Sequence, residues 1–184
     1  VRTPPPNEEF ISMGGSVTTY HFPARGDKPP VTMKWYEAGM DVPKPRRWED
    51  GRALHGEGGM YMEGTRETLY HGDMRPTSPE LTPSAHFAEM KAELKKIDRT
   101  EPLGKGPIDE FYRAIKGEIA APGSSFDYAA ALTEVVLLGA LAQRTGRTIE
   151  WDAATMTVKG QPELASMIKE PTREGWSYGE DLWK

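Results

Sequence analysis

Residues 122–146 decide how this chain folds, and they read PGSSFDYAAALTEVVLLGALAQRTG. Ser124 and Asp127 stand three residues apart just after a Pro-Gly pair, in a pattern that resembles the capping box of a helix start. Gly146 is a typical residue just past a helix end. We therefore expect one long helix here, which runs to about Thr145.

The middle of this predicted helix, residues 135–142, is apolar on all sides. A helix at the surface of a single domain normally keeps one polar face toward water. We therefore expect two covers for it, one from a sheet of its own domain and one from a further domain or subunit. The rest of the chain offers no obvious second cover.

Five further segments are predicted as β-strands. Residues 16–22 (SVTTYHF) are rich in β-branched and aromatic residues, and residues 31–36 (VTMKWY) alternate between two faces. Residues 60–62 and 68–71 flank a turn that contains glycine, which predicts a hairpin. Residues 148–151 are the last predicted strand.

Three shorter helices are also expected. One has Ser84 as its N-cap, the second spans residues 107–116, and the third spans residues 162–169. Residues 38–57 carry Gly, Pro and charges without a period and predict a long surface loop. Apolar residues at helical spacing mark the first two helices: Phe87, Met90, Leu94 and Ile97, then Ile108, Phe111, Tyr112 and Ile115.

Composition narrows the possible functions. The chain has 184 residues, which fits one domain, and its net charge of −5 makes nucleic acid an unexpected partner. Cysteine is absent, which excludes disulfides, thiolate metal sites and a cysteine nucleophile. The sequence contains no run of about 18 apolar residues that would predict a membrane span, so we expect a soluble protein, and its location, cytoplasmic or periplasmic, stays unknown. The chain opens with Val1 and a loose, Pro-rich segment, residues 1–15, so we expect that an upstream signal or domain precedes it.

Familiar catalytic and nucleotide-binding motifs are missing from the sequence. Residues 56–61 (GEGGMY) resemble the start of a dinucleotide-binding loop, but they lack its last small residue and precede a predicted strand, so we interpret them as a turn. The four histidines do not stand at metal-ligand spacing. His21 and His71 lie in predicted strands, whereas His55 lies in the long loop and is the freest to contact a ligand.

Three segments, in this order, carry a family resemblance. They are residues 21–36 (HFPARGDKPPVTMKWY), residues 124–146 with the motif SSFDYA, and residues 149–152 (IEWD), followed by Arg173, Gly175 and Trp176. Over residues 16–178 the chain resembles the C-terminal domain of the bacterial Gfo/Idh/MocA-like oxidoreductases.

The resemblance implies an α+β fold with a large, mostly antiparallel open sheet. Helices cover one face of that sheet, and the other face often forms a subunit interface, so a homo-oligomer is expected. Family members pair this domain with an N-terminal Rossmann domain, bind NAD or NADP at the junction, and take a hydride from a sugar or cyclitol. Residues 16–184 are thus expected to be the substrate-binding and oligomerisation domain, with the Rossmann domain absent from this chain.

The expected site residues all lie on the substrate side. The catalytic lysine, histidine and aspartate of the family have no counterpart here, so we predict no catalytic, cofactor-binding or metal-binding residue, and no activity for this chain alone. Ser124, Ser125, Asp127 and Tyr128 at the helix start offer hydroxyl, carboxylate and backbone N–H groups to a polyol. His55 is the further candidate. Helix capping and packing are the competing interpretation of the first four residues.

Two alternatives stay open. One is a non-catalytic carbohydrate-binding or scaffold module, in which Trp35, Tyr36 or Trp48 stacks on sugar rings. The other keeps the same domain, but the longer protein to which it belongs, called the parent below, is then an NAD-dependent glycoside hydrolase, as some members of the family are. The sequence does not decide the sugar, the choice between NAD and NADP, or the direction of the reaction.

Overall fold

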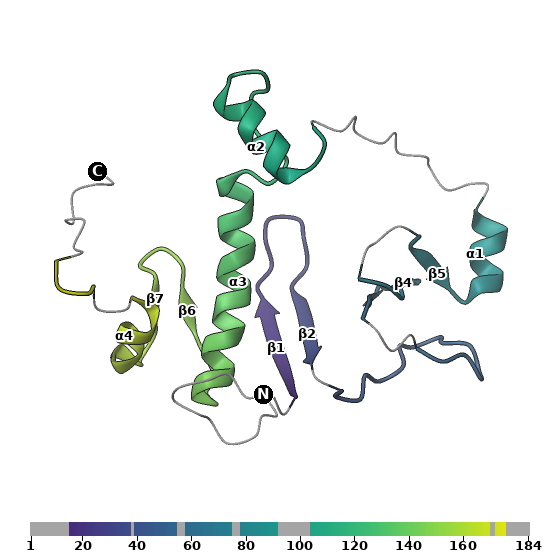
Figure 1. Ribbon diagram of the computed structural model, residues 1–184. Coiled ribbons are helices and arrows are strands. Elements are labelled where there is room, and N and C mark those ends of the chain that lie inside the picture. The colour runs from purple at the N-terminus through teal and green to yellow at the C-terminus, as the bar shows by residue number, and fades with distance from the viewer. Residues whose placement is uncertain are drawn as a thin grey trace. The chain divides into compact units, whose positions relative to one another are not determined.

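Figure 1 shows a computed structural model of the chain. It describes residues 15–37, 39–54, 58–74, 78–91, 104–169 and 172–175. The chain divides into two compact units, unit 1 from the ranges 1–40 and 104–184, and unit 2 from the range 41–103. Helices and small antiparallel sheets occur together, so the expected α+β class is confirmed. Each unit is described by itself.

Unit 1 begins with a hairpin of two seven-residue strands. β1 (Ser16–Phe22) and β2 (Val31–Glu37) pair in antiparallel fashion over their whole length. Both predicted strands are confirmed, because β-branched and aromatic side chains suit the pleated backbone. In the connection, Arg25 and Lys28 exchange two backbone hydrogen bonds of 3.0 Å each, and the prolines on either side cannot donate to the ladder.

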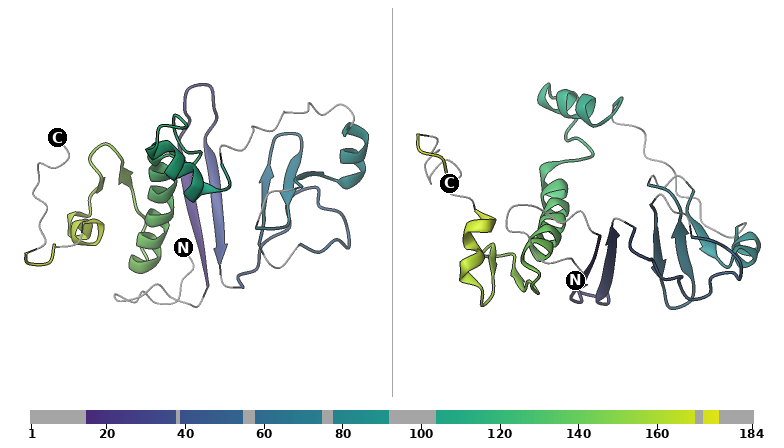
Figure 2. Two further views of the ribbon diagram at one scale, coloured as in Figure 1. Left: turned by 45° about the horizontal axis from the view of Figure 1, so that its top comes forward. Right: turned by 60° about the horizontal axis from the view of Figure 1, so that its bottom comes forward.

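The other elements of unit 1 follow from residue 104 onward. They are α2 (Pro107–Ile115), α3 (Phe126–Thr145), β6 (Trp151–Asp152), β7 (Thr157–Val158), the 3-10 helix η1 (Pro162–Leu164) and α4 (Ala165–Ile168). The predicted long helix is confirmed as α3, and its C-cap Gly146 has a φ of 65°, a conformation that glycine adopts without strain. In Figures 1 and 2, α3 lies between the β1-β2 hairpin and the β6-β7 hairpin.

One side of α3 packs against β1 through a contact that needs glycine. A Cβ added at Gly139 would lie 1.9 Å from the hydroxyl oxygen of Tyr20, so any larger residue requires the phenol or the helix to shift. One turn further on, Gln143 Nε2 donates hydrogen bonds to Ser16 Oγ (2.8 Å) and to Glu37 Oε2 (2.7 Å). Burial and, after it, the negative charge of Glu37 raise the pKa of Tyr20. The contact between α3 and the hairpin therefore contains the neutral phenol of Tyr20 and the hydrogen-bonded amide of Gln143.

A second side of α3 packs against the C-terminal elements of unit 1. Leu141 is buried together with Val158 of β7 and Leu164 of η1. The Trp151 indole N–H donates a hydrogen bond to Glu134 Oε1 at 2.6 Å. The expectation that the chain offers no second cover for this helix is therefore wrong for the C-terminal half of α3.

Within the described part of the chain, α3 is the one helix with the length and mean hydropathy of a membrane span. Length and composition do not separate a membrane-spanning helix from one that packs against other protein. On two of its sides α3 packs against protein, through Gly139 and through Leu141.

Unit 2 is a three-stranded antiparallel sheet with a short helix beside it. Its strands are β3 (Met60–Glu63), β4 (Thr68–His71) and β5 (Glu80–Thr82), in the order β3-β4-β5, and α1 (Ser84–Met90) lies next to β5. The predicted hairpin is confirmed, and a hydrogen bond of 2.8 Å from Gly64 N–H to Glu67 O closes its turn. β5 has only three residues, too few to show an alternating pattern, and the sequence does not predict it.

An irregular segment, residues 41–54, covers one face of this sheet. The ring of Trp48 meets Tyr70 of β4 edge to face, with 4.7 Å between ring centres, and the guanidinium of Arg52 lies 4.5 Å from the centre of the Trp48 ring. The predicted long loop is confirmed for its described residues, none of which lies in a helix or strand. In this unit the loop takes the place of a packing layer.

Charged groups fasten the same segment to β5 and α1. Arg52 pairs with Glu49 (Nη1 to Oε2, 2.9 Å) and with Glu80 of β5. Glu49 also accepts a hydrogen bond from the backbone N–H of Ser84. Hydrogen bonds from Ser84, and after them one from Arg52, lower the pKa of Glu49 to about 2. Ser84 is the first helical residue of α1 and Pro83 is its N-cap, so the prediction of Ser84 as N-cap is wrong.

Two expectations about the sheets are also wrong for the described residues. The strands form separate sheets of two, three and two strands, not one large open sheet. The strand predicted at residues 148–151 begins only at Trp151, as β6, and pairs with β7, which the sequence does not predict. Strands of two or three residues make short ladders, and the Gly- and Pro-containing segments between the longer strands interrupt pairing.

Candidate functional site

The start of α3 carries four of the five predicted site residues. α3 begins at Phe126 with Ser125 as its N-cap, whose backbone is extended at φ −60° and ψ 157°. No side chain caps this end, so the predicted capping box of Ser124 and Asp127 is not formed. The backbone N–H groups of the first turn are therefore left without a side-chain partner and can donate to a ligand oxygen.

The side chains at this helix start face outward. Ser124 and Asp127 are exposed, Ser125 is half-buried, and Tyr128 is 64% exposed. The structure thus brings these four residues together within about one helical turn, and their role in substrate binding stays a prediction. The fifth candidate, His55, lies outside the described residues.

α2 is attached to the start of α3. Glu110 Oε2 accepts a hydrogen bond from the Gly123 N–H at 2.8 Å, and Phe111 meets Phe126 edge to face with 6.1 Å between ring centres. The predicted apolar stripe of α2 is not buried, and Ile108 is 86% exposed. A wide hollow at the start of α2 is lined by Lys105, Gly106, Pro107, Ile108, Asp109 and Tyr112.

Apolar exposure continues along the outer side of α3. Leu132, Val136 and Leu137 are 55%, 56% and 61% exposed, although Val136 and Leu137 belong to the run of residues 135–142 that is apolar on all sides. Contiguous apolar surface on a protein commonly marks a site that another domain or chain covers. The expectation of a further partner therefore stays a prediction for this side of α3, beyond the two sides that pack within unit 1.

The other residues that the sequence singled out lie elsewhere. Trp48 is enclosed by Arg52 and Tyr70, so its ring face is not free to stack on a sugar, whereas Trp35 of β2 is half-exposed. His71 of β4 is buried. Within the described part of the chain, no group of three or more His, Asp or Glu side chains could hold a metal ion.

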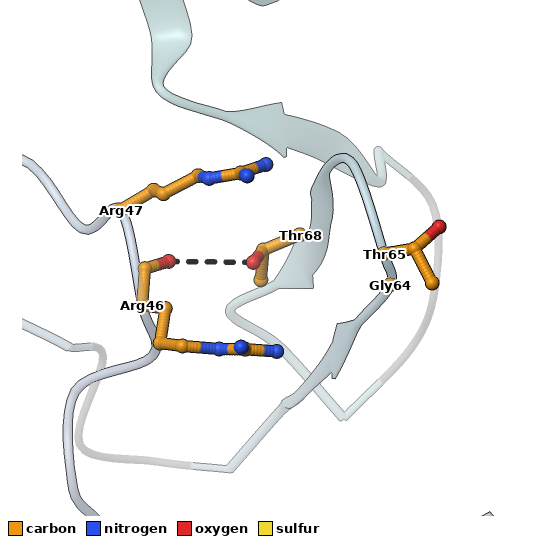
Figure 3. A pocket seen from close by; sticks show the side chains of 5 residues that line it. All are labelled: Arg46, Arg47, Gly64, Thr65 and Thr68. Carbon is orange, nitrogen blue, oxygen red and sulfur yellow. Dashed lines mark hydrogen bonds between the residues drawn. The ribbon is translucent and has the colours of Figure 1, made fainter.

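Unit 2 contains a pocket that the sequence does not predict (Figure 3). It has a volume of about 220 Å³ and is lined by Arg46, Arg47, Gly64, Thr65 and Thr68. Both arginine side chains extend in the same direction from the loop toward the β3-β4 turn. An adjacent arginine pair inside a long loop is the only sign of it in the sequence. The pocket itself exists because the loop folds against that turn.

Comparison of the sequence with protein-family models and with curated proteins finds no match. The family resemblance of residues 16–178 therefore stays a prediction, and a function has to be argued from the surfaces described above.

Proposed function

We propose that this chain is the substrate-binding and oligomerisation domain of an NAD(P)-dependent sugar or cyclitol oxidoreductase of the Gfo/Idh/MocA type. One observation carries the proposal. The helix that bears the SSFDYA motif, α3, exposes an apolar outer side, with Leu137 61% exposed, directly after a turn of polar groups. A Rossmann domain on another part of the parent protein would cover the apolar side and leave the polar turn at the junction.

The polar groups at the start of α3 suit a polyol ligand. The uncapped backbone N–H groups donate hydrogen bonds, the carboxylate of Asp127 accepts them, and the hydroxyls of Ser124, Ser125 and Tyr128 can do both. Neighbouring hydroxyls of a sugar or cyclitol also donate and accept. A mixed set of this kind therefore recognises a polyol better than a set of donors alone.

The glycine segment before β3 lacks the geometry of a pyrophosphate-binding loop. Gly58 and Gly59 lead into β3, whereas a pyrophosphate site needs a helix that opens directly after the glycines. Gly59 instead allows the hairpin to close, since a Cβ there would lie 2.3 Å from His71 O. We therefore assign NAD or NADP to the Rossmann domain of the parent and derive no catalytic step for this chain.

The subunit interface of the family belongs to the same proposal. Val31 and Trp35 of β2 lie on the face of the hairpin that packs against α3. Trp35 pairs with Thr18, which is two residues before Tyr20 in β1 and therefore lies on the same face as Tyr20. The side chains of Val31 and Trp35 are each about half-exposed. Because this is the helix-covered face, another element of the parent would cover it, and the subunit interface is expected on the opposite face of the hairpin.

The upstream coding sequence and the intact parent test the proposal. We expect an in-frame Rossmann domain before Val1, and NADH formation when the parent meets a suitable sugar or cyclitol. In the parent, Tyr128→Phe and Asp127→Asn should raise KM about tenfold with a smaller change in kcat. Arg25→Gln, in the exposed β1-β2 connection, should leave both constants unchanged. Micromolar binding of NAD or NADP to this chain alone in calorimetry would overturn the proposal.

The half-exposed Trp35 favours one alternative, a carbohydrate-binding module without catalysis. That function predicts sugar binding by this chain alone and its loss in Trp35→Ala. An NAD-dependent glycoside hydrolase predicts instead that the parent releases free sugar without net NADH formation, so product analysis separates it from the oxidoreductase.

A further inference from the structure

We propose that the pocket of unit 2 binds a small molecule through an oxyanion group, a carboxylate or a phosphate. The guanidinium groups of Arg46 and Arg47 would hold that group. This inference goes beyond the proposed function and does not rest on it, since the pocket lies within unit 2 and is built from residues 46–68.

The charges of the pocket favour an anion. Within the described residues Arg47 has no carboxylate partner, and Arg46 has a loose one, with Nε 3.6 Å from Glu63 Oε1. Two guanidinium groups, both exposed to solvent, thus stand against one carboxylate in a chain whose net charge is −5. The planar guanidinium matches the two oxygens of a carboxylate or phosphate, which makes arginine the usual residue for such ligands.

The loop that carries these arginines is held in place before any ligand binds. The backbone N–H of Arg46 donates to Glu63 Oε1 at 2.6 Å, and its carbonyl accepts a hydrogen bond from Thr68 Oγ1 at 3.4 Å. Tyr61 Oη donates to the carbonyl of Pro43 at 3.1 Å. Three hydrogen bonds therefore fix residues 43–47 to the β3-β4 hairpin, which lowers the ordering cost of binding.

Arg47 has an unusual backbone conformation. Its φ of 64° lies in the left-handed region, which residues other than Gly, Asn and Asp seldom adopt. With this backbone conformation the side chains of Arg46 and Arg47 both extend toward the β3-β4 turn, as Figure 3 shows. An arginine at such a position costs stability, which is consistent with a role for its side chain in the pocket.

The size of the pocket sets the kind of ligand. The pocket of about 220 Å³ equals the volume of about seven water molecules, which admits an anionic group with a short carbon skeleton. Thr65 also lines the pocket, but its hydroxyl points away from the two arginine side chains in Figure 3. Carboxylate and phosphate both provide such an anionic group, so the probes have to distinguish them.

Titration of the full chain, followed by backbone amide NMR at constant ionic strength, tests the proposal. The probes are sodium gluconate, sodium phosphate and, as a neutral analogue, glucose. At least one anion should shift the amides of Gly64, Thr65 and Thr68, whereas glucose should not. Which anion binds more tightly identifies the group. The absence of such shifts with either anion at about 50 mM overturns the proposal, because paired arginine contacts support binding well below that concentration.

Matched variants separate the pocket from general charge attraction. Arg46→Gln and Arg47→Gln should each weaken the anion about fivefold or more, since each removes a charge-assisted hydrogen bond. Arg25→Gln removes the same charge from the exposed β1-β2 connection and should change affinity less than about twofold. Equal weakening in Arg25→Gln would mean that the anion is drawn by charge alone, and the pocket proposal would be wrong.

A second variant covers the case in which Arg47→Gln folds poorly. Glycine suits the left-handed backbone at position 47. Arg47→Gly should therefore leave the chain at least as stable as the unmodified chain, but should abolish its binding of the anion. Retained binding in a folded Arg47→Gly protein would overturn the assignment.

Discussion

The two units cover their strands in opposite ways. In unit 1 a regular helix, α3, packs on β1, and the fit depends on the absence of a side chain at Gly139. In unit 2 the irregular segment 41–54 covers the sheet, and the fit depends on the presence of one long side chain, Arg52. A helix satisfies its own backbone hydrogen bonds and needs only a matching shape, whereas a loop must be fixed by side-chain hydrogen bonds and charges.

Among the variants that test this comparison, Gly139→Leu should cause the largest loss of stability. The new side chain collides with Tyr20 and pushes α3 away from β1, which should cost about 3 kcal/mol of stability despite the roughly 1 kcal/mol that leucine gains over glycine in helix propensity. Denaturant unfolding with amide exchange of β1 measures it. Ala130→Leu, on the exposed surface of the same helix, is the control and should change stability by less than about 0.5 kcal/mol. Equal midpoints for the two variants would show that the contact with Tyr20 is not tight.

Arg52→Met should have the next largest effect, and in unit 2 only. The variant keeps much of the aliphatic volume but loses the bonds to Glu49 and Glu80 and the stacking on Trp48, a loss of about 2 kcal/mol. Amide exchange of β4 and β5 reports it. In the control, Arg147→Met breaks an exposed pair with Glu163 and should cost less than about 0.5 kcal/mol. If both variants lose the same stability, Arg52 is no more than a surface charge.

Acid should weaken unit 2 through Glu49. Its pKa in the folded protein is about 2, below the ordinary 4.5, so its contribution is complete above pH 4.5 and is lost as the pH falls through about 2. Amide exchange of β5 and α1 should therefore rise over this window. Glu49→Gln should flatten the dependence, whereas Glu118→Gln, an exposed residue of unit 1, should not. An unchanged acid profile in Glu49→Gln would contradict the role of this carboxylate.

Leu137→Ser should have the smallest effect on stability, under about 0.5 kcal/mol, because the side chain is 61% exposed. Its expected effect is on association, since it removes apolar area from the outer side of α3. Light scattering of this chain, with and without the variant, measures it as self-association, because without the Rossmann domain the exposed apolar side is free to contact a second copy. A stability loss of several kcal/mol would instead show that this side of α3 is packed within the chain, and the apolar outer side could then not bind a Rossmann domain.

The candidate site could be foreseen in part. Ser124, Ser125, Asp127 and Tyr128 are neighbours in the sequence, so a helix start brings them together whatever the rest of the fold does. The capping of that start could not be foreseen, because it depends on rotamers that the sequence pattern leaves open. The pair Arg46 and Arg47 is visible in the sequence, but its pocket is closed by a turn about twenty residues further along the chain.

What the sequence by itself determined is local. α3 and the hairpin strands β1, β2, β3 and β4 follow from the period of apolar residues and from turn residues, and these interactions act between near neighbours in the chain. The tertiary structure alone decided which sides of α3 are covered, that a loop covers the sheet in unit 2, that β5, β6 and β7 are short, and that the strands form three separate sheets. These features depend on contacts between distant residues, such as Gly139 with Tyr20 and Arg52 with Glu80, which no local pattern encodes.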